Sequence, residues 1–253
     1  MSFPSNTPSR FVVLDTGFER YSLALIESTG GGAPALAGSF LSSSGEKAST
    51  RLHGELGRLM EKSGWTAHSF GGIVVNVGPG SFTGLRVGIA AAKGLARALE
   101  IPIYAADSLS ALADGAAARN PDPARRILAI VDVRKSMVTA RLFERQGSEA
   151  GQTEILPAGP EITETPQGIW DRLELKGDEP PTLIGDGAMR YSEFWKSQWG
   201  DEAILLPHPE IQLAEILGRR AILDMATGRM QPTAMDELQP RYARKAEVEF
   251  RPA

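Results

Sequence analysis

The sequence has no cysteine among its 253 residues. Disulfide bonds, thiolate nucleophiles and cysteine-ligated zinc sites are therefore excluded. Histidine is also scarce: His53, His68 and His208 stand alone, and no pair has the helical spacing that a metal site uses. No motif holds the elements of a Ser-His-Asp triad. We expect neither a bound metal nor a catalytic nucleophile in this chain.

An excess of positive charge is missing as well. The net charge is -4, from 27 Lys and Arg against 31 Asp and Glu, so the chain should bind nucleic acid only weakly by itself. No stretch approaches the roughly 18 apolar residues of a membrane helix. Residues 1–10 lack the apolar run of a signal peptide. We expect a cytoplasmic protein that does not enter a membrane, with a flexible tail over residues 1–9.

What is present is a pattern of short apolar runs and amphipathic segments that occurs twice. In each half an apolar run ending in aspartate, Asp15 or Asp132, opens a predicted hairpin. Strands are predicted at 11–15, 21–26, 35–41, 71–77, 102–105, 126–132, 137–143 and 182–184. Helices are predicted at 47–63, 83–99, 166–173, 191–199 and 209–227.

The repeat predicts an α/β, duplicated two-lobed fold. The expected parts are an N-terminal lobe over 10–106, a C-terminal lobe over 107–208, a C-terminal helix within 209–230 and an extended tail over 231–253. Packing of that helix back on the N-terminal lobe is one option. The charged residues of 237–249 are expected to be solvated.

A glycine-rich turn connects a buried strand to the helix at 83–99. Free backbone N–H groups beside the positive end of a helix can bind an anion. The phosphate-binding candidates are Gly78, Gly80, Ser81 and Thr83. The alternative is that Ser81 or Thr83 only caps the helix and the glycines only permit a tight turn. The pattern is neither a Walker loop nor GxGxxG.

The helix at 83–99 is apolar around most of its circumference. Its polar residues, Arg86, Lys93, Arg97 and Glu100, fall within roughly 60° of one another at the helical repeat. A surface helix usually has a narrower apolar face. This helix is therefore either sandwiched within its own chain or covered by a second one, and both alternatives stay open.

Residues 74–96, VVNVGPGSFTGLRVGIAAAKGLA, resemble the signature of the TsaB family, which is YeaZ-like and has also been called glycoprotease-like. Further family-like segments occur in the right order. They are LDTG at 14–17, where the family more often has DTS, VDVRKSMV at 131–138, IGDGAMRY at 184–191 and PRYAR at 240–244. The resemblance implies the fold of actin, sugar kinases and heat-shock ATPases.

The resemblance also implies a function. Family members act in the making of threonylcarbamoyladenosine on tRNA as a non-catalytic scaffold that pairs with the catalytic subunit TsaD and with the ATPase TsaE. They form a homodimer when TsaD is absent, and tRNA is reached only through the complex. The name glycoprotease has no support from the residues. The alternatives are an actin-fold ATPase or a peptidase acting alone, and a purely structural homodimer.

Two sets of site residues follow from the resemblance. Asp15, Thr16 and Gly17 are candidates for nucleotide binding, with Asp132 and Asp186 across the cleft; Asp15 as a plain turn residue stays open. Arg134 and Lys135 follow Asp132 where a phosphate loop favours glycine, so we expect a degenerate cleft. No cofactor is expected, with weak or interfacial ATP or ADP left open. The expected partner interface is Leu52, Leu56, Leu85, Gly88, Ala91 and Leu95.

Overall fold

The structure is a computed structural model, which describes residues 9–28, 33–120, 122, 126–147, 153–175, 179–207 and 212–241. Its first sheet has the strand order β3-β2-β1-β4-β5. The strands are β1 (Ser9–Asp15), β2 (Ser22–Ser28), β3 (Ala35–Leu41), β4 (Phe70–Gly78) and β5 (Ile103–Asp107). β1, β2 and β3 form an antiparallel meander, while β4 and β5 run parallel to β1.

The second sheet repeats this plan. Its order is β11-β10-β6-β7-β8. The strands are β6 (Ile127–Asp132), β7 (Val138–Gly147), β8 (Thr153–Pro157), β10 (Thr182–Ile184) and β11 (Ile204–Leu206), and β9 (Ile162–Glu164) pairs with β7. With β6 in the place of β1, order and strand directions match the first sheet. The predicted α/β, duplicated two-lobed fold is confirmed.

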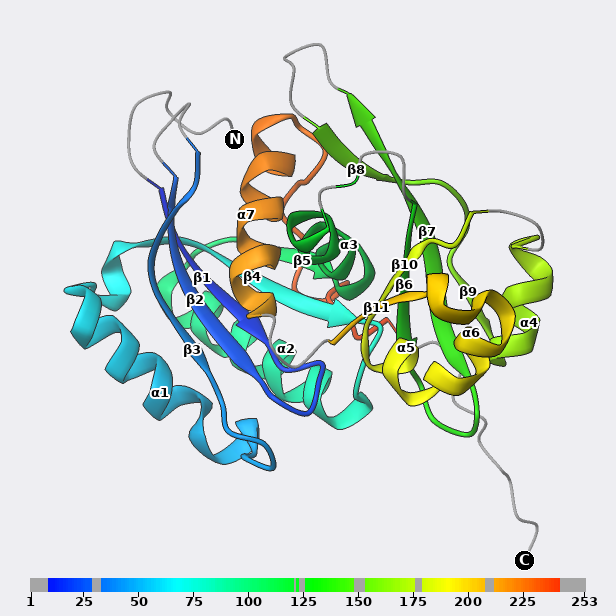
Figure 1. Ribbon diagram of the computed structural model, residues 1–253. Helices are drawn as coiled ribbons and strands as arrows, with labels where there is room; N and C mark the ends of the chain where they lie inside the picture. Colours follow the sequence, from blue (N-terminus) through cyan, green and yellow to red (C-terminus); the bar gives the residue numbers. More distant parts are fainter. Residues whose placement is uncertain are drawn as a thin grey trace, which may run out of the picture.

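The helices form layers around the two sheets (Figure 1). α1 (Ala48–Ser63) and α2 (Phe82–Leu99) cover the outer face of the first sheet. α4 (Pro166–Arg172), α5 (Asp186–Arg190) and α6 (Ser192–Trp199) cover the outer face of the second sheet. α3 (Ser108–Arg119) and α7 (Leu213–Ala226) lie between the sheets; each follows one lobe and packs on the other, α3 on β6 and α7 on β1 and β2.

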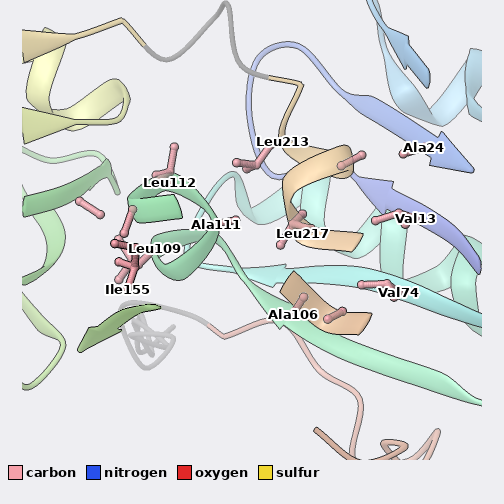
Figure 2. Packing of buried hydrophobic residues seen from close by; sticks show 14 of the residues in the cluster. Val13, Ala24, Val74, Ala106, Leu109, Ala111, Leu112, Ile155, Leu213 and Leu217 are labelled. Atoms are coloured by element: carbon pink, nitrogen blue, oxygen red, sulfur yellow. The ribbon is translucent and has the colours of Figure 1, made fainter. Parts of the chain in front are cut away.

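One hydrophobic core joins the two lobes. Figure 2 shows Leu213 and Leu217 of α7 near Val13 and Val74 of the first sheet, and Leu109 of α3 beside Ile155 of β8; all six belong to a single buried cluster. Separating the lobes would expose the apolar side chains of this cluster to water, which is unfavourable.

An ion-pair network reinforces the joint. The Arg220 guanidinium of α7 donates to Asp114 of α3 at 3.1 Å, to Asp224 at 2.9 Å and to the Ile155 carbonyl at 3.1 Å. Burial raises the pKa of Asp114 to about 6, against the opposing effect of Arg220. The network therefore connects three elements from both lobes.

α3 is the main element that the sequence pattern missed. Eight of its residues are buried, on all sides of the helix, because it contacts the second sheet, α7 and the first sheet. A helix buried all round has no apolar stripe to reveal its period. Strands β8, β9 and β11 and the short helix α5 were not predicted either. The other predicted elements are present, with bounds that differ by a few residues.

Residues 231–241, here called the C-terminal strap, return to the first lobe. Thr233 N–H donates to the Ile103 carbonyl at 2.7 Å, and Arg241 N–H donates to the Val77 carbonyl at 2.7 Å. Leu238 is buried in the core beneath α1 and α2, and the Arg241 guanidinium pairs with Glu161 of the other lobe. The exposed Glu237 and Arg241 agree with the predicted solvation of the charged residues, but Leu238 and these backbone bonds hold the segment against the first lobe.

The remaining predicted tail residues, 242–253, lie outside the described residues, as do residues 1–8. Ser9, which was assigned to the N-terminal tail, begins β1. Across the described ranges, no helix has both the length and the apolar character to span a bilayer.

Candidate functional site

The first hairpin turn begins at Asp15, whose carboxylate is fully buried. Asp15 Oδ1 accepts hydrogen bonds from Asn76 Nδ2 at 2.7 Å and from Gly17 N–H at 3.0 Å, and Oδ2 accepts one from Ser22 Oγ at 3.4 Å. Burial raises the pKa of Asp15 to about 6, against the opposing effect of these three bonds. The carboxylate is used inside the protein rather than presented to a ligand.

Asn76 extends this polar contact into a network. Its Oδ1 accepts from Gly78 N–H at 2.8 Å and from Ser108 Oγ at 2.9 Å. The network therefore holds together the first hairpin turn, the glycine-rich turn and the start of α3. Sequence reasoning missed Asn76 and Ser108. A single amide within the apolar strand FGGIVVNVG was the signal that could have found Asn76, because a buried amide needs partners.

α2 packs directly on the first hairpin turn. Ser81 N–H donates to the Gly17 carbonyl at 2.7 Å, and Thr16 Oγ1 donates to the Gly84 carbonyl at 2.7 Å. A Cβ on Gly84 would lie 2.0 Å from the Thr16 carbonyl oxygen, and one on Gly80 would lie 2.5 Å from that of Gly17. No side chain fits between the two segments.

Asp15 and Thr16 of the predicted phosphate site are therefore buried, and Gly17 and Gly80 pack against each other; phosphate binding there stays a prediction. Gly78 is buried as well, with a positive φ of 107°. At the helix start, Ser81 Oγ accepts from Gly84 N–H at 3.3 Å, so the capping alternative is confirmed for Ser81. Thr83 is exposed on the first turn of α2.

The residues of the predicted partner interface lie mostly inside the monomer. Leu52, Leu56, Leu85, Gly88 and Ala91 are buried within the monomer, and Leu95 is half-buried against the same core. α2 contacts its sheet, α1 and the first hairpin turn, so most of its circumference is used within the chain. Gly88 faces inward, since a Cβ there would lie 2.3 Å from Thr16 Oγ1.

A different set of residues faces outward on these two helices. α2 exposes Phe82, Ala90 and Gly94, and α1 exposes Gly54 and Gly57. A Cβ on Gly54, Gly57 or Gly94 would meet no atom within 4 Å. We call this set the outer face of α1 and α2. Glycine inside a helix costs about 0.5–1 kcal/mol relative to alanine, and nothing in the monomer requires it at these positions.

The second hairpin turn brings Asp132 and Asp186 together. Asp132 N–H donates to Asp186 Oδ1 at 2.9 Å, and Arg134 N–H donates to Asp132 Oδ1 at 3.1 Å. Burial raises the pKa of Asp186 to about 6. Within the described ranges no three His, Cys, Asp or Glu side chains are grouped so as to hold a metal ion, and both His53 and His68 are exposed. His208 lies outside those ranges.

The chain is similar to proteins of one biosynthetic system. Residues 25–160 match the family model described as TsaD, tRNA N6-adenosine threonylcarbamoyltransferase. The tRNA threonylcarbamoyladenosine biosynthesis protein TsaB of Escherichia coli strain K12 is 30% identical over 160 residues, which is 61% of this chain. The match covers 65% of the E. coli protein, so this chain spans less than two thirds of that relative.

Two further comparisons agree. TsaB of Bacillus subtilis strain 168 is 46% identical over 72 residues, covering 28% of this chain and 30% of the relative. A solved structure from Pseudomonas aeruginosa, described as an uncharacterized protein with similarity to peptidase YEAZ, superimposes with a TM-score of 0.70 at 27% identity. That superposition covers 93% of this chain and the whole of the other.

Proposed function

The chain belongs to the TsaB/YeaZ family, and from this premise we propose that it is the non-catalytic scaffold of the complex that makes threonylcarbamoyladenosine on tRNA. Its partner is a TsaD-like catalytic subunit, joined by a TsaE-like ATPase, and tRNA is held chiefly by the complex. The observation that carries the proposal is the packing of α2 on the first hairpin turn. This packing closes the two segments on each other and buries the Asp15 carboxylate, whereas an active ATPase of this fold needs open space for phosphate.

The joint between the lobes supports the same proposal. Kinases and ATPases of two lobes commonly close around a ligand by hinge motion. Here α3, α7 and the Arg220 network fill the space between the sheets with one continuous core. Such a body is suited to presenting a fixed surface rather than to opening and closing.

The outer face of α1 and α2 is the proposed docking surface for the catalytic subunit, and for a second copy when that subunit is absent. Phe82 is 50% exposed there, which suits an apolar anchor at an interface. The exposed glycines Gly54, Gly57 and Gly94 permit close approach of a partner helix. The resemblance predicted an interface on these two helices, and the residues proposed here are ones that the helices expose.

The test is to replace Gly94 with Arg. No atom of the chain lies within 4 Å of a Cβ there, so the monomer should keep its fold and its thermal stability. A large charged side chain buried at the interface should weaken binding of the TsaD-like subunit at least about tenfold. Binding would be measured by calorimetry or by co-purification. Gln167→Arg, which adds the same charge on exposed α4, is the control.

Unchanged binding of the TsaD-like subunit by the Gly94→Arg variant would show that the outer face of α2 is not the contact.

The catalytic part of the proposal has its own test. The purified chain should hydrolyse neither ATP nor peptides and should not modify tRNA without the TsaD-like subunit. Turnover of any of these substrates that persists through purification, at rates of an ordinary enzyme, would refute the scaffold role.

A further inference from the structure

The second hairpin turn holds an unusual backbone conformation. Arg134, Lys135 and Ser136 are consecutive non-glycine residues with φ of 68°, 52° and 60°. A left-handed conformation costs such residues about 1 kcal/mol or more each, and the cost tends to persist where side chains serve a function. Glycine would remove the strain here. Instead the turn places two cations at its exposed tip.

A third cation meets this turn from α5. Arg190 Nε lies 3.6 Å from Asp132 Oδ2, and Arg134 Nη1 lies 4.0 Å from the same oxygen. One carboxylate thus holds two guanidinium groups near each other. The Asp132 side chain is only 7% exposed, whereas those of Arg134 and Arg190 are 81% and 56% exposed. The positive groups therefore face solvent, and the carboxylate lies beneath them.

The location favours an anionic ligand. Asp132 ends β6, and α5 follows β10, which runs parallel to β6. Ligands of open α/β sheets bind outside the carboxyl ends of such strands. We propose that Arg134, Lys135 and Arg190, here called the basic patch, contact phosphates of the RNA backbone.

The choice of RNA rests on the proposed function, which brings tRNA to the complex. Exposed cations gain little from one small anion because water and salt screen each pair. A polyanion that contacts three cations together gains additional affinity from the release of counterions. The net charge of -4 keeps this contact weak in the isolated chain, so it would act as a secondary contact within the assembly.

The experiment compares two triple variants of the full chain. Arg134→Gln, Lys135→Gln and Arg190→Gln remove the basic patch. Lys62→Gln, Arg172→Gln and Lys196→Gln remove the same charge at exposed positions elsewhere. Binding of fluorescently labelled unmodified tRNA is followed by anisotropy over a salt series that begins at low salt. ATP and a poly-glutamate peptide serve as competitors, and circular dichroism checks the fold.

The proposal expects the patch variant to bind tRNA at least fivefold more weakly, with a slope of log affinity against log salt that is smaller by about 2. The control variant should stay within twofold of the unmodified chain. Equal losses in both variants, no loss in either, or no tRNA binding by the unmodified chain at low salt would overturn the proposal. Stronger competition by poly-glutamate than by tRNA would overturn it in favour of an acidic protein partner. Association with the TsaD-like subunit, measured separately, tests the proposed function whatever the outcome here.

Discussion

The two hairpin turns occupy equivalent places in the duplicated fold but have opposite environments. The first, at Asp15, is covered by α2 and has its carboxylate fully buried. The second, at Asp132, projects exposed cations. The difference follows from the residues: Thr16 and Gly17 are small enough for the glycines of α2 to pack on them, whereas Arg134 and Lys135 are too large and too charged to be covered.

A duplicated fold can thus keep a hairpin turn at the same place in each copy while using it differently. In the first copy the loop is part of the core and stabilises the surface helices. In the second copy it is free to meet another molecule. Three substitutions test this contrast.

The largest effect is expected for Gly84→Ala. The added Cβ would lie 2.0 Å from the Thr16 carbonyl oxygen, so α2 must move away from the first hairpin turn. We expect a loss of at least about 3 kcal/mol in the free energy of unfolding, because the obstacle is backbone rather than a flexible side chain. Denaturant unfolding measures it. Gly94→Ala on the open side of the same helix is the control and should stabilise by about 0.5–1 kcal/mol. Wild-type stability of Gly84→Ala would show that α2 does not close this turn.

The second effect concerns pH. The pKa of Asp15 is about 6 in the folded protein, against 3.8 in the unfolded chain. The contribution of Asp15 to stability is therefore fully present below pH 3.8 and is lost as pH rises through 6. Asp15→Asn should remove this loss, which amounts to at most about 3 kcal/mol at about 1.4 kcal/mol per pKa unit. The measurement is the free energy of unfolding from pH 4 to pH 7. An unchanged pH profile would mean that the carboxylate is hydrated. Asp186→Asn makes the matched change beside the second turn.

The smallest effect is expected for Arg134→Gly, which relieves one positive φ in the second turn. The gain should be about 0.5–1 kcal/mol, since glycine adopts this conformation readily but loses more entropy on folding. Thermal unfolding measures it. Arg134→Gln removes the charge and keeps the strain, so it should give no gain. A gain from the Gln variant equal to that from Gly would attribute the effect to charge repulsion instead.

Sequence patterns predicted most of the fold because they report local chemistry. Short continuous apolar runs ending in aspartate predicted both hairpins, and the Gly78–Ser81 turn predicted the start of α2. α3 was missed because eight of its twelve residues are buried and leave no polar face. The return of residues 231–241 was missed because a lone apolar residue, Leu238, carries no periodicity.

The site was predicted less well than the fold. The segments were identified, yet which side of a helix faces inward depends on what packs beside it. Gly84 and Gly88 stand four residues apart, a spacing that indicates close approach of another backbone. The sequence does not say whether that backbone belongs to the same chain. Here it is the turn at Thr16, and the outward glycines are Gly54, Gly57 and Gly94 instead.

The C-terminal strap and α7 have a consequence for synthesis of the protein on the ribosome. The second sheet is drawn from one continuous stretch, residues 127–206, and its aromatic core around Trp170 and Trp195 lies within that stretch. The first sheet is translated earlier, yet its inner face is covered mainly by α7, and its outer core includes Leu238. The half that is made first must therefore wait until α7 and residues 231–241 have been translated before it can bury the apolar residues of its inner face, while the later half can begin to fold as soon as it emerges.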